Sequence, residues 1–253
     1  MQNMVRLGLW VWIVLGSGVC SVSLPEITDG NFAEQCVKEH NTARSSVHPP
    51  ASDMLYMTWD GGLAATALAW AKQCVFEHNP NPVHPSFTSI GENIWAGYPP
   101  SHFDVSGAIK LWVDEKQHYH YSSNTCTKVC GHYTQVVWAS SDKVGCAVQR
   151  CPNGVRKTSF DTTDGAVFVC NYAAAGNVNR RRPYQTKGDA CSGCKGRCVD
   201  RLCRSNWTQD QEPALNSGSD YVAVVVVRPI ALICTFIAAY AVHHHYPDIF
   251  WYE

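Results

Sequence analysis

Thirteen cysteines in a chain of 253 residues restrict the available folds more than any other feature of this sequence. The chain opens with a short apolar run, Val5–Val19, around Arg6, and small residues follow near Gly16–Ser23. This pattern is typical of a cleaved secretory signal peptide, which we place at residues 1–22. A retained membrane anchor is the alternative, but the run is short for a span of ~20 residues. A secreted chain meets oxidising conditions, so we expect most of its cysteines to form disulfide bonds.

The number of cysteines left after processing is odd. Cys20 lies in the signal peptide and Cys234 in an apolar C-terminal run, so eleven of the thirteen remain. At least one of these is therefore unpaired or bonds to another chain.

Four cysteines lie close together between residues 188 and 205, in the pattern Cys191-x2-Cys194-x3-Cys198-x4-Cys203. This spacing alone would also suit a zinc knuckle with four thiolate ligands. Secretion favours disulfide bonds instead, because nothing keeps thiols reduced outside the cell. We therefore expect a small disulfide-rich hinge here.

The C-terminal region contains a candidate membrane anchor, Val222–Val242. Twenty-one residues of helix just cross a hydrocarbon layer of about 30 Å, and Arg228 lies near enough to one end to reach the interface. We expect a single-pass type I span, preceded by a polar stalk (206–221) with a glycosylation sequon at Asn206 and followed by a short tail (243–253). The alternatives are a lipid-anchor signal near Ser217–Ser219, against which the polar tail argues, and a buried soluble helix.

Between these ends the chain alternates between helical and strand patterns. Apolar residues at helical spacing predict helices around Phe32–His40, Leu63–Cys74 and Val105–Val113, with Asp60 and Asp104 as N-caps. Runs of Val, Tyr, Trp and Phe predict strands at Tyr133–Ala139, Val144–Gln149 and Ala166–Tyr172. Residues 79–89 and 96–103 are expected to be loops. This mixed order predicts an α+β domain in which helices cover the faces of a sheet.

Charge gives little information about partners for the chain as a whole. The formal net charge is −1, so we expect no nucleic-acid partner. The local exception is a basic segment between residues 180 and 204, for which the alternatives are a solvated linker surface and a contact with acidic glycans or lipid head groups. Its basic residues are Arg180, Arg181, Arg182, Lys187, Lys195, Arg197, Arg201 and Arg204.

Four ordered motifs carry a family resemblance. They are His40-Asn41-x-x-Arg44, Gly91-Glu92-Asn93-Ile94, Gly131-His132-Tyr133 and Phe168-Val169-Cys170-Asn171-Tyr172. Together they resemble the signature motifs of the CAP superfamily, which comprises the cysteine-rich secretory proteins, antigen 5 and plant pathogenesis-related 1. The resemblance implies a three-layer α-β-α sandwich for residues 30–178. The loop before Gly131, the stalk and the final apolar segment resemble one branch of this family in particular.

The resemblance also implies a disulfide pattern. In the domain it implies Cys74 with Cys151, Cys146 with Cys170 and Cys126 with Cys130, and in the hinge Cys191 with Cys198 and Cys194 with Cys203. Cys36 is then the odd residue.

The same resemblance implies a polar cleft formed by His78, Glu92, Glu115 and His132. Their separations along the chain do not by themselves predict that they meet. If they do meet, the imidazoles of His78 and His132 suit tetrahedral Zn²⁺, with Glu92 and Glu115 in support. The alternative is a hydrogen-bonded network that holds the loops to the sheet. His40 and Arg44 are expected to tie the first helix to the core.

Three functions follow as hypotheses. The first is a membrane-tethered extracellular binding module that takes a divalent metal in the cleft. The family resemblance also implies that it binds a sterol or other lipid. The loop that contains Trp95, Tyr98 and Phe103 is the candidate lipid site, and the alternative is that this loop packs against the domain. The second is a zinc-dependent hydrolase that uses the same tetrad, although the sequence contains neither Gly-x-Ser-x-Gly nor His-Glu-x-x-His. The third is an adhesion or signalling surface. The location expected is the outer face of the plasma membrane, with a secreted form as an alternative.

Overall fold

The structure is a computed structural model that describes residues 23–204. The signal peptide, the sequon at Asn206, the stalk and the Val222–Val242 segment lie outside the described residues. Within residues 23–204, no helix is both long enough and apolar enough to cross a membrane.

The centre of the domain is a four-stranded sheet with the order β1-β5-β6-β2. β5 (Lys143–Cys151) and β2 (Gly91–Gly97) both pair antiparallel with β6 (Gly165–Ala173), and the short β1 (Thr58–Trp59) lies parallel to β5. Every residue of β6 is buried, because it is a central strand with helices on both faces of the sheet.

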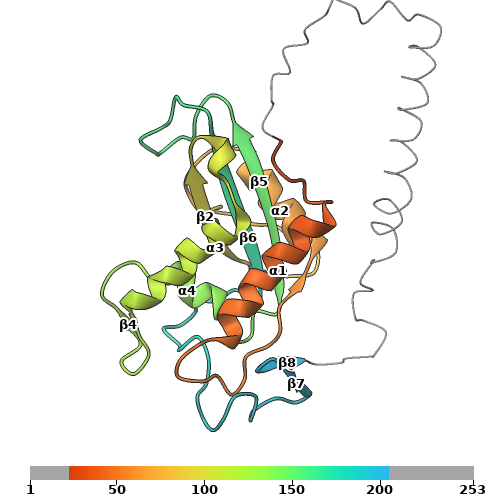
Figure 1. The fold of residues 1–253 in the computed structure, drawn as a ribbon, viewed down its shortest axis with the longest axis vertical. Coiled ribbons are helices and arrows are strands. Elements are labelled where there is room, and N and C mark those ends of the chain that lie inside the picture. The colour runs from red at the N-terminus through yellow and green to blue at the C-terminus, as the bar shows by residue number, and fades with distance from the viewer. Residues whose placement is uncertain (1–22, 205–253) are drawn as a thin grey trace, which may run out of the picture. The chain divides into compact units, whose positions relative to one another are not determined.

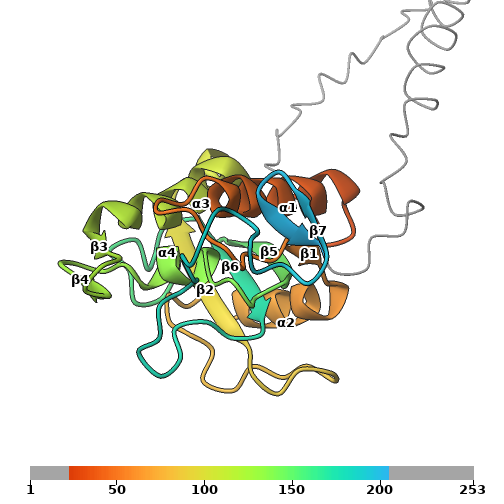
Figure 2. The same ribbon diagram turned by 90° about the horizontal axis from the view of Figure 1, so that it is seen from below.

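Helices form the two outer layers. α1 (Gly30–Ser45) and α3 (Val105–Asp114) lie on one face of the sheet and α2 (Gly61–Ala71) on the other (Figure 1, Figure 2). Alternate side chains of β6 pack on opposite faces of the sheet. Phe168 packs in the core that includes residues of α1 and α3, and Val167 packs with α2. This arrangement confirms the predicted α-β-α sandwich.

The helices begin where the sequence predicts. The carboxylate of Asp60 accepts a hydrogen bond from the backbone N–H of Leu63, and that of Asp104 accepts one from Gly107, so both aspartates are N-caps. Gly145 on β5 leaves no room for a Cβ atom against the backbone of Ala64 and Asp60. The absence of a side chain there lets α2 lie directly on the sheet.

The strand predicted at Tyr133–Ala139 is wrong. The structure instead contains a short helix, α4 (Gly131–Val136), followed by irregular backbone. Most of these residues are buried, so the Val, Tyr and Trp content reflects packing against the core rather than extended backbone. Both ends of the helix are bonded by side chains from distant segments, which local sequence does not show.

Two smaller differences concern β2 and the loops. β2 was not predicted, and the expected loop at 96–103 begins within it and contains a 3-10 turn, η1 (Pro100–His102). The expected loop at 79–89 is irregular, as predicted. A second 3-10 turn, η2 (Glu115–His118), leads to a hairpin of β3 (Tyr119–His120) and β4 (Thr125–Cys126).

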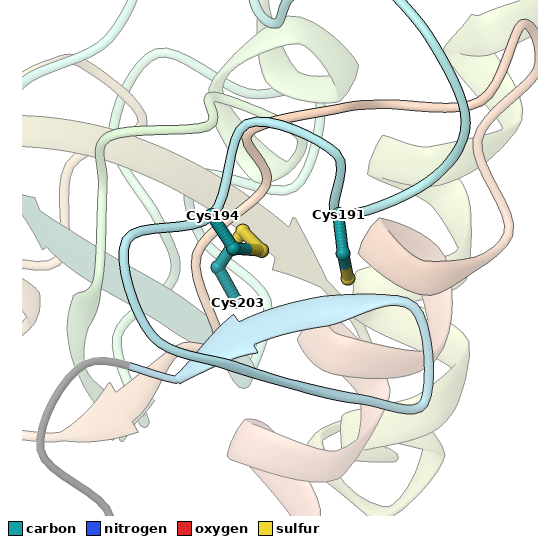
Figure 3. A group of neighbouring side chains, drawn as sticks. All are labelled: Cys191, Cys194 and Cys203. Carbon is teal, nitrogen blue, oxygen red and sulfur yellow. A yellow bond between two sulfur atoms is a disulfide. The ribbon is translucent and has the colours of Figure 1, made fainter.

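The hinge is a compact hairpin of β7 (Arg197–Val199) and β8 (Leu202–Arg204). The structure contains the five disulfide bonds that the family resemblance implies: Cys74–Cys151, Cys126–Cys130, Cys146–Cys170, Cys191–Cys198 and Cys194–Cys203. Cys36 is a buried free thiol. The sulfur atoms of Cys191, Cys194 and Cys203 lie close together, and Figure 3 shows the last two joined. Disulfide bonding accounts for this group, so it is not a thiolate zinc knuckle.

Candidate metal site

The structure brings the four predicted cleft residues together from four segments. His78 lies in the loop after α2, Glu92 on β2, Glu115 at the end of α3 and His132 at the start of α4. They form two His–Glu pairs, and the two imidazole ring centroids are 6.4 Å apart.

In the first pair, an exposed histidine contacts a buried carboxylate. His78 Nδ1 lies 2.9 Å from Glu92 Oε1, and the side chains are 61% and 7% exposed respectively. The same oxygen accepts a 2.9 Å bond from the backbone N–H of Asn79, and Oε2 lies 3.4 Å from the amide of Asn171. The hydrogen bond from His78 to Glu92 raises the pKa of His78, and burial only partly opposes this.

The second pair also caps a helix. His132 Nδ1 lies 2.6 Å from Glu115 Oε1, while Glu115 Oε2 accepts hydrogen bonds from the backbone N–H groups of His132 (3.0 Å) and Tyr133 (3.3 Å). Burial by itself raises the pKa of Glu115. The hydrogen bond and charge of His132, together with the two backbone donors, outweigh it and lower the pKa. The carboxylate is thus held ionised at the N-terminus of α4, where the helix dipole also favours negative charge.

The carboxylates determine which ring nitrogens are available. An ionised carboxylate only accepts hydrogen bonds, so Nδ1 of His78 and of His132 must each carry a hydrogen and donate it. In the neutral imidazole the lone pair is then on Nε2. A metal-binding histidine ordinarily donates its other ring N–H to a carboxylate or carbonyl in this way. The pairs therefore fit a metal site in which the histidines are ligands and the glutamates orient them.

The number of nearby ligand atoms and the separation of the two rings both restrict how these residues could bind a metal. In the part of the chain that the structure describes, the only group with three such ligand atoms within 4.8 Å of one another is the cysteine group of the hinge. The tetrad therefore offers two protein ligands. With Zn–N bonds of about 2.0–2.1 Å, two imidazoles on one tetrahedral ion would have centroids roughly 5 Å apart. The observed separation of 6.4 Å is larger, so the two rings would have to move closer to bind one ion, and His78 is the more exposed of the two.

The ring of His132 lies against an aromatic stack. Its ring is nearly parallel to that of Trp112, with centroids 6.2 Å apart, and Trp112 stacks in turn on Phe168 at 5.3 Å. Of the two candidate ligands, His132 is therefore the more tightly packed and His78 the more exposed.

A buried hydrogen-bond chain runs from α1 to the site. His40 Nδ1 donates to the carbonyl of Cys36 (2.7 Å), so Nε2 accepts from the hydroxyl of Tyr172 (2.8 Å). The amide of Asn93 donates to that hydroxyl (3.2 Å) and to the carbonyl of His132 (3.1 Å). Burial lowers the pKa of His40 to about 4, which keeps its ring neutral. The chain therefore connects the first helix to the backbone of the site.

Arg44 holds the other end of α4. Its side chain is fully buried and donates to the carbonyls of Val136 (2.9 Å), Trp138 (2.7 Å) and Ala139 (3.1 Å), and to that of Leu55. These bonds satisfy the carbonyl of Val136 at the C-terminus of α4 and two carbonyls just beyond the helix. Burial lowers the pKa of Arg44 to about 9. The expectation that His40 and Arg44 tie the first helix to the core is confirmed.

The sequence reasoning missed the roles of Asn93 and Tyr172. Both belong to motifs that were recognised, Gly91–Ile94 and Phe168–Tyr172, but a motif does not show which of its side chains point inward. The available signal was the presence of polar residues beside the apolar residues of these two motifs.

The three aromatic residues considered for lipid contact behave differently from one another. Trp95 and Phe103 are packed against the core, and their centroids are 5.6 Å apart. Phe103 also lies 5.1 Å from Phe168. Only Tyr98 is well exposed, at 54%, and it lies beside Phe160. The observed contacts are those of a loop packed on its own domain.

Comparison with known proteins identifies the family that has this architecture. Residues 37–172 match the model of the family described as "CAP: Cysteine-rich secretory protein family". The chain is 41% identical to mouse (Mus musculus) glioma pathogenesis-related protein 1, over 97% of this chain and 98% of that one. It is 45% identical to human (Homo sapiens) GLIPR1-like protein 1, over 78% and 81% of the two chains.

A solved structure described as "Crystal structure of NaASP2 with Zn2+" is also similar. It is 29% identical, with a TM-score of 0.56 over 70% of this chain and 96% of that one. The sandwich, the four motifs and these matches agree, and the chain belongs to the cysteine-rich secretory protein (CAP) family.

Proposed function

We propose that this extracellular CAP-family protein is a binding module whose cleft takes a divalent metal ion, Zn²⁺, on Nε2 of His78 and His132. The observation that supports this most directly is the pairing of both Nδ1 atoms with carboxylates, which leaves Nε2 of each ring as the nitrogen with a lone pair. The likeness to a structure solved with Zn²⁺ adds weight. With two protein ligands, the remaining positions on the ion belong to water or to a bound partner.

The same contacts argue against the hydrolase hypothesis. A carboxylate that acts as a general base needs a lone pair that is available to take a proton from water. The oxygens of Glu92 and Glu115 already accept five hydrogen bonds from His78, Asn79, His132 and Tyr133, with Asn171 at 3.4 Å from the remaining one. The lowered pKa of Glu115 makes it a weaker base still. We therefore favour binding over catalysis.

Membrane attachment through residues 222–242 remains part of the proposal. A sterol or lipid ligand receives less support, because two of the three aromatic residues considered for it are packed inward. An adhesion surface with an unused cleft becomes the better account if the protein binds no metal.

Zinc titration by calorimetry tests the metal site. We expect one Zn²⁺ to bind, and His78→Ala to weaken binding at least about tenfold because one of two imidazole ligands is lost. His78 suits this test because its side chain is largely exposed, so its removal should leave the fold intact. His120→Ala removes another exposed histidine and is the matched control. Unchanged affinity in His78→Ala would refute the assignment.

A further inference from the structure

The end of the described chain differs in charge from the rest of the domain. Residues 177–204 contain eight Lys and Arg against two Asp, a net charge of +6. Residues 23–176 contain ten Lys and Arg against fourteen Asp and Glu, a net charge of −4. A local field of this sign attracts anions even though the net charge of the whole chain is close to zero.

Most of these cations are exposed and have no acidic partner. We call five of the exposed cations the basic surface: Arg180, Arg181, Lys187, Lys195 and Arg201. Among residues 23–204, the salt bridges formed by lysine and arginine lie elsewhere, at Lys110, Arg150 and Lys157. The side chains of the basic surface also make no intramolecular hydrogen bond within the described range. Their charges are therefore available to an external anion.

The backbone that carries the basic surface is held firmly to the domain. Two disulfides close the hinge, and the N–H groups of Gly193 and Cys203 donate to the carbonyls of Ser52 (2.8 Å) and Met54 (2.7 Å). The guanidinium of Arg204 lies 3.7 Å from the ring centroid of Tyr56. In Figure 1 the segment, drawn in teal and blue, gathers at one end of the sandwich. A preorganised array of cations loses less conformational entropy when a ligand binds.

Arg182 connects the segment to the hairpin of β3 and β4. It donates to the carbonyls of Tyr121 (3.0 Å) and Ser122 and lies over the ring of Tyr121. The amide of Asn124 donates to the carbonyl of Arg180 (2.7 Å). These contacts fix the backbone at Arg180 and Arg181, so the first cations of the basic surface have a defined position.

We propose that the basic surface binds a sulfated polysaccharide of the extracellular matrix. Several unpaired cations on one segment suit a polymer with repeated anionic groups, and guanidinium groups bind sulfate and phosphate oxygens through paired hydrogen bonds. The protein is extracellular, whereas anionic phospholipids are concentrated in the cytoplasmic leaflet of the membrane. The surface shares no residue with the His–Glu pairs.

Binding of the full chain to immobilised heparin tests the proposal. We expect affinity to fall about one hundred- to five hundredfold between 50 and 200 mM salt, as for other binding to polyanions through about five charges. The double variant Arg181→Ala/Lys187→Ala should bind roughly tenfold more weakly and with a shallower salt dependence. Lys72→Ala/Lys116→Ala removes two exposed lysines elsewhere on the domain and should bind like the parent. Equal melting temperatures would show that both variants are folded.

Two comparisons determine whether sulfated glycan is the right partner. Heparin from which the sulfate groups have been removed should bind at least tenfold more weakly than intact heparin. Vesicles with phosphatidylserine should bind more weakly than heparin at the same salt concentration. The proposal is overturned if the two double variants bind equally, if desulfated heparin binds as well as heparin, or if the vesicles bind and heparin does not.

Discussion

Glu115 contacts His132 through both of its carboxylate oxygens, one on the ring nitrogen Nδ1 at 2.6 Å and the other on the backbone N–H at 3.0 Å. One side chain therefore orients a candidate ligand and also caps the helix that carries it. Site geometry and local folding depend on the same contact.

Glu115→Gln should therefore affect stability and zinc binding together. A neutral amide loses the charge-assisted bonds to His132 and Tyr133, and the carboxylate is only partly buried, so we expect a loss of about 1–2 kcal/mol in the free energy of unfolding. Denaturant unfolding measures this, and zinc titration should show weaker affinity. Asp114→Asn, the neighbouring acid in an exposed pair with Lys110, is the control. A variant with normal stability and normal zinc affinity would contradict the dual role.

Tyr172→Phe tests the buried chain between α1 and the site. Loss of the hydroxyl leaves His40 Nε2 and one bond of the Asn93 amide without a partner in the core. Each unsatisfied buried group costs roughly 1–3 kcal/mol, so we expect the free energy of unfolding to fall by at least about 1 kcal/mol. Tyr98→Phe removes an exposed hydroxyl and should change it little. Equal effects of the two substitutions would show that the chain contributes nothing.

The buried imidazole of His40 should make the fold sensitive to mild acid. Its pKa falls from about 6.5 when unfolded to about 4 when folded, so the unfolded chain takes up a proton that the folded chain excludes. The contribution is complete above pH 6.5 and is lost as pH falls toward 4, by about 1.4 kcal/mol per pH unit. The free energy of unfolding measured against pH should have a shallower slope in His40→Gln than in the parent. His120→Ala should keep the parent slope.

Arg44→Lys should destabilise the domain more than any of these changes. A lysine keeps the charge but cannot reach the same set of carbonyls, so several buried acceptors at the end of α4 lose their donors. We expect the free energy of unfolding to fall by about 3–5 kcal/mol. The control is Arg181→Lys, because Arg181 is exposed. If Arg44→Lys unfolds at the parent's denaturant midpoint, these carbonyl bonds do not hold α4.

Local patterns predict most of the sandwich but not the elements that carry the site. α1, α2, α3, β5 and β6 follow from periodicity and capping, because each has several residues that indicate the same structure. α4 does not, because its aromatic and β-branched residues favour a strand and the bonds that make it helical come from Glu115 and Arg44. β2 was missed because it begins with Gly91, Glu92 and Asn93, which have low strand propensity.

The convergence of the tetrad was also beyond local reasoning. The four residues come from a loop, a strand and two helix ends, and only the family resemblance placed them together. The structure adds what the resemblance did not supply, namely that both Nδ1 atoms face carboxylates. That detail favours the histidines over the glutamates as candidate ligands.

Anomalous diffraction at the zinc edge, from crystals grown with Zn²⁺, tests the central claim most directly. The account predicts one strong peak in the cleft, bonded to Nε2 of His78 and Nε2 of His132, with Glu92 and Glu115 still on the Nδ1 atoms. No peak between the two imidazoles, or a peak bonded to the carboxylates instead, would contradict it.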